Sequence, residues 1–456
     1  MIPFGIYVAA MAAGGKTVNL AEDKLITSVV TDSRQVESGS LFVAIKGERV
    51  DGHDYLNDVF LRGASAALVD HIPEGVTGPC ILVNDTVKGL QDIAEWYRRM
   101  RNVTVIGVTG SVGKTSTKEV IAGTLSASHR VLKTEGNHNN EIGLPLTVFN
   151  IEENTEIAVL EMGISNFGEM RVLSKVARPD ICVITNIGEA HLEYLKSRDG
   201  ILRAKSEIFE YMNPNGRIYL NGDDDKLQTI TDVNGITPVH YGFSEDNRAY
   251  PTDIVEEGLA GTSMTIHIGA YEFKARINIP GHHMVANAVC AAAIAYDLGM
   301  ASDSIVKGLN SARTIGGRCN IIPYKDEGFI IDDCYNASPA SMKAAIDTLN
   351  LAKENRKVAI LGDMFELGAN SDEMHASIGR YAVEQGVDKL ICVGDNCIHM
   401  YNAAMQTKGH TGIVHYKTLD SLLANLSMEV KPKDNILVKS SNGMGFSKLI
   451  EALKNR

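Results

Sequence analysis

Short apolar runs alternate with segments of helical periodicity over most of the 456-residue chain. This alternation is typical of α/β domains, in which helices cover a mostly parallel sheet. Four strands are predicted in the first part of the chain, at residues 25–34, 40–47, 65–70 and 80–85. We therefore predict a small α/β domain over residues 1–84.

A second, larger sheet is predicted in the next part of the chain. A helix is expected over residues 90–101. Buried strands are expected after it, at residues 103–110, 156–163, 180–188 and 216–224. Alternating polarity at 264–268 predicts a β-hairpin, as an insertion or at a sheet edge. Residues 284–299 predict an apolar helix whose end, Gly299, tolerates left-handed geometry. This domain is predicted over residues 85–312.

A third α/β set begins after residue 312. Its predicted strands lie within residues 328–336, 356–364, 388–396, 412–416 and 435–441. We find no internal repeat of fixed period and no low-complexity segment. The pattern therefore predicts an α/β chain of three domains, the last a Rossmann-like domain over residues 313–456.

Composition narrows the class of protein. Hydrophobic residues make up 44% and charged residues 22% of the chain, as in soluble globular proteins. The net charge of -12 argues against nucleic acid as a partner, because phosphate backbones bind to basic surfaces. The seven scattered cysteines suit a reducing cytoplasm. Residues 1–15 lack the basic start of a signal peptide, and no run reaches the ~18 apolar residues of a membrane span, so we expect no membrane insertion.

A phosphate-binding loop is predicted within residues 105–120, VIGVTGSVGKTSTKEV. The strict pattern G-x-x-x-x-G-K-[ST] would need glycine where Val108 stands. Because the loop follows a strand and opens a helix, backbone N–H groups and the helix dipole converge on phosphate oxygens. Lys114 would face the β and γ phosphates, and Thr115 would offer its hydroxyl to magnesium. A second G-K-T, at residues 15–17, lacks an upstream strand and predicts only a turn.

Two further residues fit a metal that bridges phosphates. Glu161 ends a predicted core strand and His191 follows the next one. Ligands of α/β proteins bind at the carboxyl ends of strands. Either residue alone would be an ordinary core or surface residue, whereas both on adjacent strand ends behind a phosphate loop predict metal ligands.

Composition leaves two other features open. Lys205 lies on a predicted helix, where a solvated lysine is the ordinary interpretation. The loop that carries Asn137, Asn139 and Asn140 is either a plain turn or, near a phosphate site, a set of amides that orient a polar substrate.

The loop TGSVGKTS, the carboxylate of LEMG, the histidine of EAHLE and the run AKSEI together resemble the Mur ligase family. The phosphate loop of that family has the form T-G-x-x-G-K-[ST], which accommodates Val108. The similarity extends from residue 31 to residue 444 through TDSRQVESGSLFVAIKGERVDGHDY, GNHNNEIGLP, PGHHMVANA, IDDCYNASPASM, LGDMFELG and LVKSSNGM.

The resemblance implies an ATP-dependent ligase with three domains. Family members activate a carboxylate as an acyl phosphate and then form an amide with an incoming amine. The motifs are most similar to the branch that adds D-alanyl-D-alanine to UDP-N-acetylmuramoyl-tripeptide in peptidoglycan precursor synthesis. The first domain would bind the UDP substrate, the central domain ATP and the last domain the dipeptide. We expect a cytoplasmic monomer.

The resemblance also implies substrate contacts. Ser33 and Arg34 would hold the UDP-sugar, with Lys46, Asp51 and His53 beside them. Further contacts would come from Asn137, Asn139, Asn140, Asp363 and Glu366.

ATP and metal ligands are implied in the same way. Nucleotide contacts would come from Thr109, Gly110, Ser111, Val112, Gly113, Lys114, Thr115, Ser116, Asn287, Arg318 and Asn336. One magnesium ion would bind Thr115 and Glu161, and a second would bind His191 and a carbamylated Lys205. Lys114, His191 and Lys205 would be the catalytic residues.

The sequence departs from the family pattern at four positions. His282 stands where arginine is common and Met284 where asparagine is common, which leaves the adenine contacts open. Asn442 replaces an arginine that would grip a carboxylate or phosphate. Ser338 replaces a second asparagine.

Other ligases and nucleotide-binding proteins are alternatives to this function. A ligase that adds diaminopimelate as the third residue would carry an Asp-Asn-Pro-Arg motif, and a GTPase an Asn-Lys-x-Asp run; neither occurs here. Folylpolyglutamate synthases lack the TDSR and DGHDY segments. A ligase-like protein that only binds nucleotide is a further alternative. The third residue of the substrate peptide, diaminopimelate or lysine, and the open or closed arrangement of the domains stay undetermined.

Overall fold

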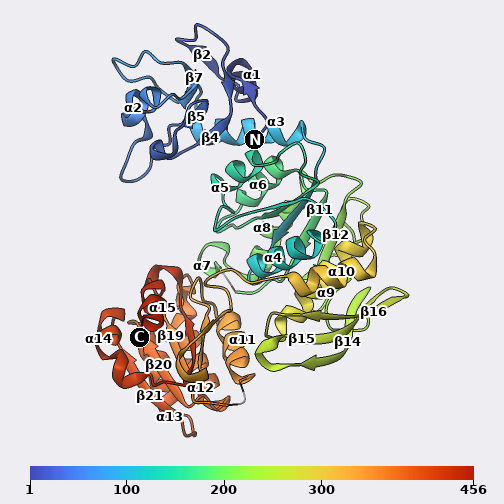
Figure 1. The fold of residues 1–456 in the computed structure, drawn as a ribbon, viewed down its shortest axis with the longest axis vertical. Helices are drawn as coiled ribbons and strands as arrows, with labels where there is room; N and C mark the ends of the chain where they lie inside the picture. Colours follow the sequence, from blue (N-terminus) through green and yellow to red (C-terminus); the bar gives the residue numbers. More distant parts are fainter. Residues whose placement is uncertain (190, 353, 456) are drawn as a thin grey trace.

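Three α/β domains follow one another along an elongated molecule, coloured from blue to red in Figure 1. The computed structural model describes residues 1–189, 191–352 and 354–455. Its three larger sheets draw their strands from residues 16–82, 104–277 and 320–439. The predicted α/β fold is therefore confirmed, and the predicted boundaries after residues 84 and 312 fall between the sheets.

The N-terminal sheet has five strands in the order β2-β7-β6-β5-β4. They are β2 (Lys16–Val18), β4 (Ser28–Val30), β5 (Ser40–Val43), β6 (Ala66–Val69) and β7 (Cys80–Leu82). All neighbours are parallel except β2 and β7. A separate pair, β1 (Phe4–Gly5) with β3 (Leu25–Ile26), and the helices α1 (Ile6–Ala12) and α2 (Leu56–Leu61) complete this domain.

Two predictions for this domain need correction. Lys16 and Thr17 do not form a turn, because they pair with Ile81 and Leu82 at the edge of the sheet. The predicted strand 25–34 is interrupted at Thr27, so its two halves join different sheets.

The central sheet has nine strands in the order β16-β15-β14-β13-β12-β11-β8-β10-β9. They are β8 (Thr104–Thr109), β9 (Val131–Lys133), β10 (Ile157–Glu161), β11 (Ile181–Ile184), β12 (Arg217–Asn221), β13 (Val239–Tyr241), β14 (Ala249–Glu256), β15 (Thr262–Ile268) and β16 (Tyr271–Ile277). Pairing is parallel from β9 to β14. It is antiparallel from β14 to β16, so the predicted hairpin is confirmed at the edge of the sheet.

Helices cover both faces of the central sheet. One face carries α4 (Lys114–Leu125), α9 (His283–Asp297) and α10 (Ser302–Ser311). The other carries α3 (Thr86–Arg99), α5 (Gly143–Phe149), α6 (Glu169–Ala177) and α8 (Arg198–Ser206). Successive residues of a strand point to opposite faces of the sheet. Val105 of β8 therefore packs on the face that α3 covers, and Ile106 packs on the face that α4 covers. The short helix α7 (Leu192–Leu195) precedes α8.

The C-terminal sheet has six strands in the order β17-β18-β22-β19-β20-β21. They are β17 (Asn320–Pro323), β18 (Phe329–Asp332), β19 (Lys357–Gly362), β20 (Lys389–Val393), β21 (Gly412–Tyr416) and β22 (Asn435–Lys439). Only β17, which the sequence pattern did not predict, is antiparallel to its neighbour. One face packs against α11 (Pro339–Asn350), α12 (Ser371–Glu384) and α13 (Cys397–Gln406), and the other against α14 (Leu419–Glu429) and α15 (Ser447–Lys454).

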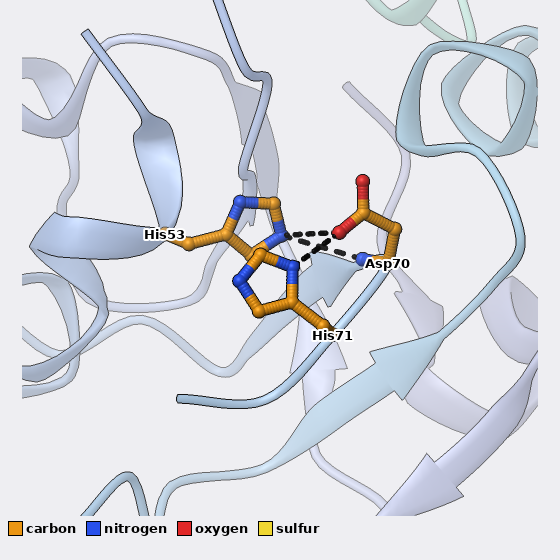
Figure 2. Close-up of side chains that lie close together, drawn as sticks. All are labelled: His53, Asp70 and His71. Atoms are coloured by element: carbon orange, nitrogen blue, oxygen red, sulfur yellow. Dashed lines mark hydrogen bonds and ion pairs between the residues drawn. The ribbon is translucent and has the colours of Figure 1, made fainter. Parts of the chain in front are cut away.

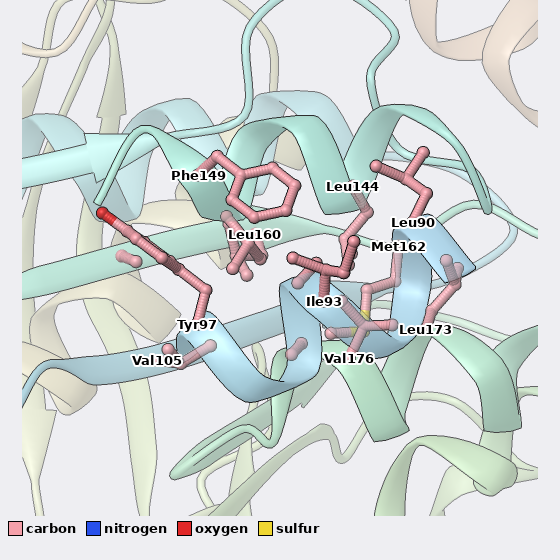
Figure 3. Packing of buried hydrophobic residues seen from close by; sticks show 14 of the residues in the cluster. Leu90, Ile93, Tyr97, Val105, Leu144, Phe149, Leu160, Met162, Leu173 and Val176 are labelled. Atoms are coloured by element: carbon pink, nitrogen blue, oxygen red, sulfur yellow. The ribbon is translucent and has the colours of Figure 1, made fainter. Parts of the chain in front are cut away.

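Helix α3 joins the first domain to the second. It begins four residues before the predicted start, because the Asp85 side chain caps it by accepting from Lys88 N. Its residues Leu90, Ile93 and Tyr97 are fully buried among side chains of the central domain (Figure 3). The apolar cluster around them is continuous from the first strand of the N-terminal domain into the central sheet. The two domains therefore share one core.

Within the described residues, no helix has the length and apolar character needed to span a bilayer.

We predict that Ile93→Ala lowers the free energy of unfolding by about 2–5 kcal/mol, because it opens a cavity in this shared core. The single tryptophan, Trp96, lies on α3 and packs edge-on against Phe4, so its fluorescence during urea unfolding follows this region. The control is Arg99→Ala, at an exposed position of the same helix. It should change the free energy of unfolding by less than about 0.5 kcal/mol. An Ile93→Ala effect as small as that of the control would contradict the shared core.

Candidate functional site

The phosphate-binding loop lies where the sequence predicts it, between β8 and α4. Gly113 has a φ of 83° and Gly110 a φ of 152°, values that side chains rarely allow. A Cβ atom on Gly110 would stand 1.9 Å from Thr185 Oγ1. No side chain caps the N-terminus of α4, so its backbone N–H groups and the positive end of its dipole face the loop. This geometry binds anionic oxygens.

The loop is held in shape by the segment after β11. Asn186 accepts from Val112 N and donates to Val112 O, both at 2.9 Å. Thr185 Oγ1 donates to the same carbonyl at 2.6 Å, and Gly188 N donates to Ser111 Oγ at 2.9 Å. Sequence reasoning missed Asn186, although the polar pair Thr-Asn directly after an apolar strand was an available signal.

Lys114 reaches back across the loop. Its Nζ donates to Gly110 O at 2.9 Å. Burial lowers the pKa of the Lys114 amine, the Glu161 carboxylate opposes that shift, and the charge of Arg318 adds to it. The cation therefore stands beside the N–H groups that would receive phosphate oxygens.

Glu161 is buried at the end of β10 with one oxygen unsatisfied. Its Oε1 accepts from Asn139 Nδ2 at 2.9 Å. Its Oε2 has no hydrogen-bond partner among the described residues. An unsatisfied buried carboxylate oxygen is costly, and a divalent cation would satisfy it. Thr115, 3% exposed at the start of α4, carries the hydroxyl that the sequence predicts for the same ion. The two residues therefore fit magnesium.

Strand order corrects one detail of the prediction. Glu161 ends β10 and His191 follows β11, but these strands are not neighbours, because β8 lies between them. The phosphate loop thus stands between the two predicted metal ligands, an arrangement that the order of the strands in the sequence does not reveal.

Lys118 lies behind Glu161 and was not predicted. Its side chain is fully buried, with Nζ 2.9 Å from Glu119 Oε1 and 3.9 Å from Glu161 Oε2. It also donates to Thr134 O at 2.6 Å, and Lys133 pairs with the other oxygen of Glu119. These charges keep Glu161 from being an isolated buried anion.

Lys205 is 1% exposed on α8, so the ordinary interpretation of a solvated lysine is wrong. Burial lowers the pKa of the Lys205 amine well below its usual range, and the charge of Lys114 lowers it further. The Lys205 side chain has no hydrogen bond or ion pair within the described residues. A lowered pKa increases the neutral fraction of the amine, and the neutral form is the one that reacts with an electrophile.

His191 is the N-cap residue of α7 and has a left-handed φ of 61°. Its Nδ1 lies 2.7 Å from Glu366 Oε2 in the C-terminal domain. The contact joins a predicted metal ligand to a predicted substrate residue from another domain.

The C-terminal domain also approaches the site through Arg318 and Tyr335. The guanidinium of Arg318 stacks over the Tyr335 ring at 4.1 Å. Burial raises the pKa of the Tyr335 hydroxyl, and the nearby Asn137 side chain opposes that shift. Buried Lys439 holds this loop, with Nζ 2.6 Å from Asp333 Oδ2 and 3.0 Å from Asn336 O. A narrow cleft beside the phosphate loop is lined in part by Thr115, Ser116, Met284 and Arg318.

Several predicted residues have their side-chain groups engaged inside the protein. The Asn287 amide accepts from Thr117 Oγ1 at 2.9 Å, between α9 and α4. Thr109 Oγ1 donates to Met162 O, and Asn140 Oδ1 accepts from Gly143 N at the start of α5. Asp363, 5% exposed, accepts from the backbone of Cys397 at 2.8 Å and so caps α13. Their predicted ligand contacts stay predictions.

In the N-terminal domain, the predicted substrate residues cluster in two turns. Ser33 and Arg34 lie in a single 3-10 turn, where the exposed Arg34 guanidinium lowers the pKa of Asp32 to about 2. Lys46 pairs with Asp51 in a β-bridge, and Asp51 Oδ1 accepts from His53 N at 3.0 Å.

The ring of His53 is 2% exposed and held between carboxylates. Its Nδ1 lies 2.7 Å from Asp51 Oδ1 and its Nε2 3.2 Å from Asp70 Oδ1. Figure 2 shows the ring stacked on that of His71, with centroids 4.1 Å apart. A metal in the plane of one stacked ring would lie outside the plane of the other, so this arrangement does not fit a shared metal.

Comparisons with known proteins agree over the whole chain. Three family descriptions match in order: "Mur ligase family, catalytic domain" at residues 25–98, "Mur ligase middle domain" at 108–295 and "Mur ligase, glutamate ligase domain" at 317–442. The UDP-N-acetylmuramoyl-tripeptide--D-alanyl-D-alanine ligase of Bacillus subtilis is 38% identical over 98% of this chain and 97% of its own.

Solved structures give the same picture. A crystal structure of MurF from Acinetobacter baumannii superposes with a TM-score of 0.91 at 32% identity, covering 100% of both chains. The MurF ligase of Thermotoga maritima, solved in complex with ADP, has a TM-score of 0.82 at 29% identity and covers 94% of this chain and 97% of that chain.

We predict that Asn186→Ala weakens ATP binding about tenfold, because it removes two hydrogen bonds that shape the loop, each worth ~0.5–1.5 kcal/mol. Isothermal titration calorimetry with ATP measures the change. The exposed Asn57→Ala in α2 is the matched control and should leave affinity unchanged. Equal affinities for the two variants would show that Asn186 does not shape the loop.

Proposed function

This chain belongs to the Mur ligase family, and from that membership we propose that it is the ATP-dependent ligase that joins D-alanyl-D-alanine to UDP-N-acetylmuramoyl-tripeptide in peptidoglycan precursor synthesis. The observation that carries the proposal is full-length similarity, through all three domains, to ligases with that activity. The phosphate loop and the charged groups around it are the parts that such a reaction requires.

Sequence features in the last domain favour the dipeptide over a single amino acid. The run LGDMFELG is present, and the Asp-Asn-Pro-Arg motif of the diaminopimelate-adding ligase is absent. A nucleotide-binding protein without ligase activity is the second candidate, suggested by the departures at Met284 and Asn442. The buried Glu161 and Lys205 argue against it, because burying both groups is costly without a function for them.

The reaction that we propose has two steps. A carboxylate oxygen of the tripeptide attacks the γ-phosphorus of ATP, the bond from that phosphorus to the bridging oxygen breaks, and ADP leaves. The amine of D-alanyl-D-alanine then attacks the carbonyl carbon, and inorganic phosphate leaves with the activated oxygen. The amine gives up one proton as the amide forms.

The residues around the loop would lower the barrier by offsetting negative charge. The first step brings a carboxylate towards a triphosphate, which is repulsive. The N–H groups of the loop and the start of α4, together with Lys114, stand where the phosphate oxygens would bind. The second step must exclude water, and the C-terminal domain already meets the central one at Glu366 and Tyr335.

Magnesium would be held by Thr115 and Glu161 at one position and by His191 and Lys205 at the other. The ions would supply positive charge that further offsets the repulsion. We propose that Lys205 carries a carbamate: its neutral amine adds to the carbon of CO₂, a proton leaves, and an anionic oxygen ligand results. The low pKa of the buried amine supports this assignment.

We further propose that the protein acts as a monomer in the cytoplasm. The seven cysteines are free, which suits a reducing compartment.

The proposed activity predicts ATP-dependent phosphate release from purified protein given UDP-N-acetylmuramoyl-tripeptide and D-alanyl-D-alanine, with the matching mass gain on the UDP product. Single D-alanine and other amino acids should give little release. Release with a single amino acid in preference to the dipeptide would assign a different step. Absence of release with every amine would favour the nucleotide-binding candidate.

We predict that Lys205→Ala loses more than about nine-tenths of turnover while ATP affinity stays near that of the unchanged protein, since metal ligands contribute several kcal/mol to catalysis. Added acetate or formate should restore part of the activity by supplying the missing carboxylate. Lys307→Ala, at an exposed position of α10, is the control. Retention of more than about a tenth of the activity by Lys205→Ala would exclude the carbamate.

A further inference from the structure

Glu366 is held towards the central domain by a rigid loop. The loop follows β19 and is fixed at three points: Asp363 caps α13, Met364 N donates to His375 Nε2 at 3.0 Å, and Phe365 N donates to Ser441 Oγ at 2.9 Å. The next residue, Glu366, has a left-handed φ of 62°. Its direction is therefore set by the C-terminal domain.

Glu366 and its partner His191 are both in a strained conformation. Each is a residue other than glycine with a positive φ, and their side chains meet at 2.7 Å. Strained residues persist where the surrounding structure fixes them, and they gather at functional sites. Glu193 of α7 lies against Gly368 at the same junction, so the loop and α7 pack directly against each other. The contact is therefore part of a larger interface between the two domains.

The contact occupies one particular nitrogen of the imidazole. Nδ1 faces the carboxylate, which leaves Nε2 as the nitrogen available to a metal. The two atoms are 2.7 Å apart, but the geometry of this contact is not that of a hydrogen bond, so the carboxylate acts on the ring through its charge and its position. A carboxylate behind a metal-binding histidine fixes the ring orientation and the tautomer, and its removal typically costs about 10–100-fold in metal affinity.

We propose that Glu366 is a positioning residue that acts from the C-terminal domain on His191, so that this ligand presents Nε2 to magnesium only when the two domains are closed. This inference rests on the proposed function, because it assigns the carboxylate a role in that reaction. It differs from the substrate contact that the sequence predicts for Glu366. The C-terminal domain, which would carry the dipeptide, would thus complete the metal site when it closes. Phosphoryl transfer would then become possible only once the amine has arrived.

The two roles of Glu366 predict different measurements. A residue that binds the dipeptide would, when removed, raise KM for D-alanyl-D-alanine and leave metal binding unchanged. A residue that positions His191 would weaken metal binding even without the dipeptide. Glutamine keeps an oxygen beside Nδ1 but removes the charge, so Glu366→Gln should retain part of the effect that Glu366→Ala loses.

The test is a Mn²⁺ titration followed by electron paramagnetic resonance, with the full-length protein and a non-hydrolysable ATP analogue. His191→Ala identifies the binding step that belongs to His191. In that step we expect Glu366→Ala to bind Mn²⁺ about tenfold more weakly, Glu366→Gln to fall between it and the unchanged protein, and the matched control Glu193→Gln to show no change. The Mg²⁺ concentration that gives half-maximal activity should rise in parallel. KM for the dipeptide should change by less than about twofold.

Unchanged Mn²⁺ affinity in Glu366→Ala, or a rise confined to KM for D-alanyl-D-alanine, would overturn the inference. Thermal melting of each variant shows whether it is folded. Turnover of the unchanged protein tests the proposed function separately: if turnover is absent, that function fails, whereas the Mn²⁺ titration still judges the link between Glu366 and His191.

Discussion

Compensation of negative charge at the carboxyl edge of the central sheet is the constraint on which the site depends. A triphosphate and a carboxylate repel each other, and they meet only where positive groups are already in place. The parallel part of the central sheet puts these groups together, because β8 lies between β10 and β11 and ends in the phosphate loop. Lys114, the N-terminus of α4 and the unsatisfied oxygen of Glu161 all face this edge.

The same edge explains why lysines are buried here. Lys118 is enclosed between Glu119, Glu161 and Thr134, where its charge offsets that of the carboxylates. Lys205 has no such partner, and burial lowers the pKa of its amine. The two lysines lie on helices that cover opposite faces of the central sheet: Lys118 on α4 is ion-paired with carboxylates, and Lys205 on α8 has a lowered amine pKa that suits modification.

The three domains are joined by two kinds of contact. The N-terminal and central domains share an apolar core around α3, so the UDP end of the substrate would be held at a fixed distance from ATP. The apolar clusters of the C-terminal domain contain residues of that domain alone. Its contacts with the central site are polar, through Glu366 and Tyr335. Polar interfaces of this kind separate more easily than apolar cores, which would suit the proposed role of this domain in delivering the amine.

Much of the fold could be predicted from the sequence, because long apolar strands and the glycine loop carry strong local signals. The strands β9 and β13 were missed because three residues are too few to establish a period. Burial of Lys205, the strand order around β8 and the role of Asn186 depend on tertiary packing, which the local pattern does not contain. The contact of His191 with Glu366 joins residues 175 positions apart, beyond the reach of any spacing rule.

The most direct test of charge-compensated carboxylate activation is the fate of an oxygen atom. UDP-N-acetylmuramoyl-tripeptide labelled with ¹⁸O in its reacting carboxylate would be turned over with ATP and D-alanyl-D-alanine, and the released phosphate examined by mass spectrometry. Transfer of one labelled oxygen to each phosphate is the predicted result, since the carboxylate oxygen attacks phosphorus and leaves with it. Phosphate free of the label would contradict activation as an acyl phosphate and the account of the site built on it.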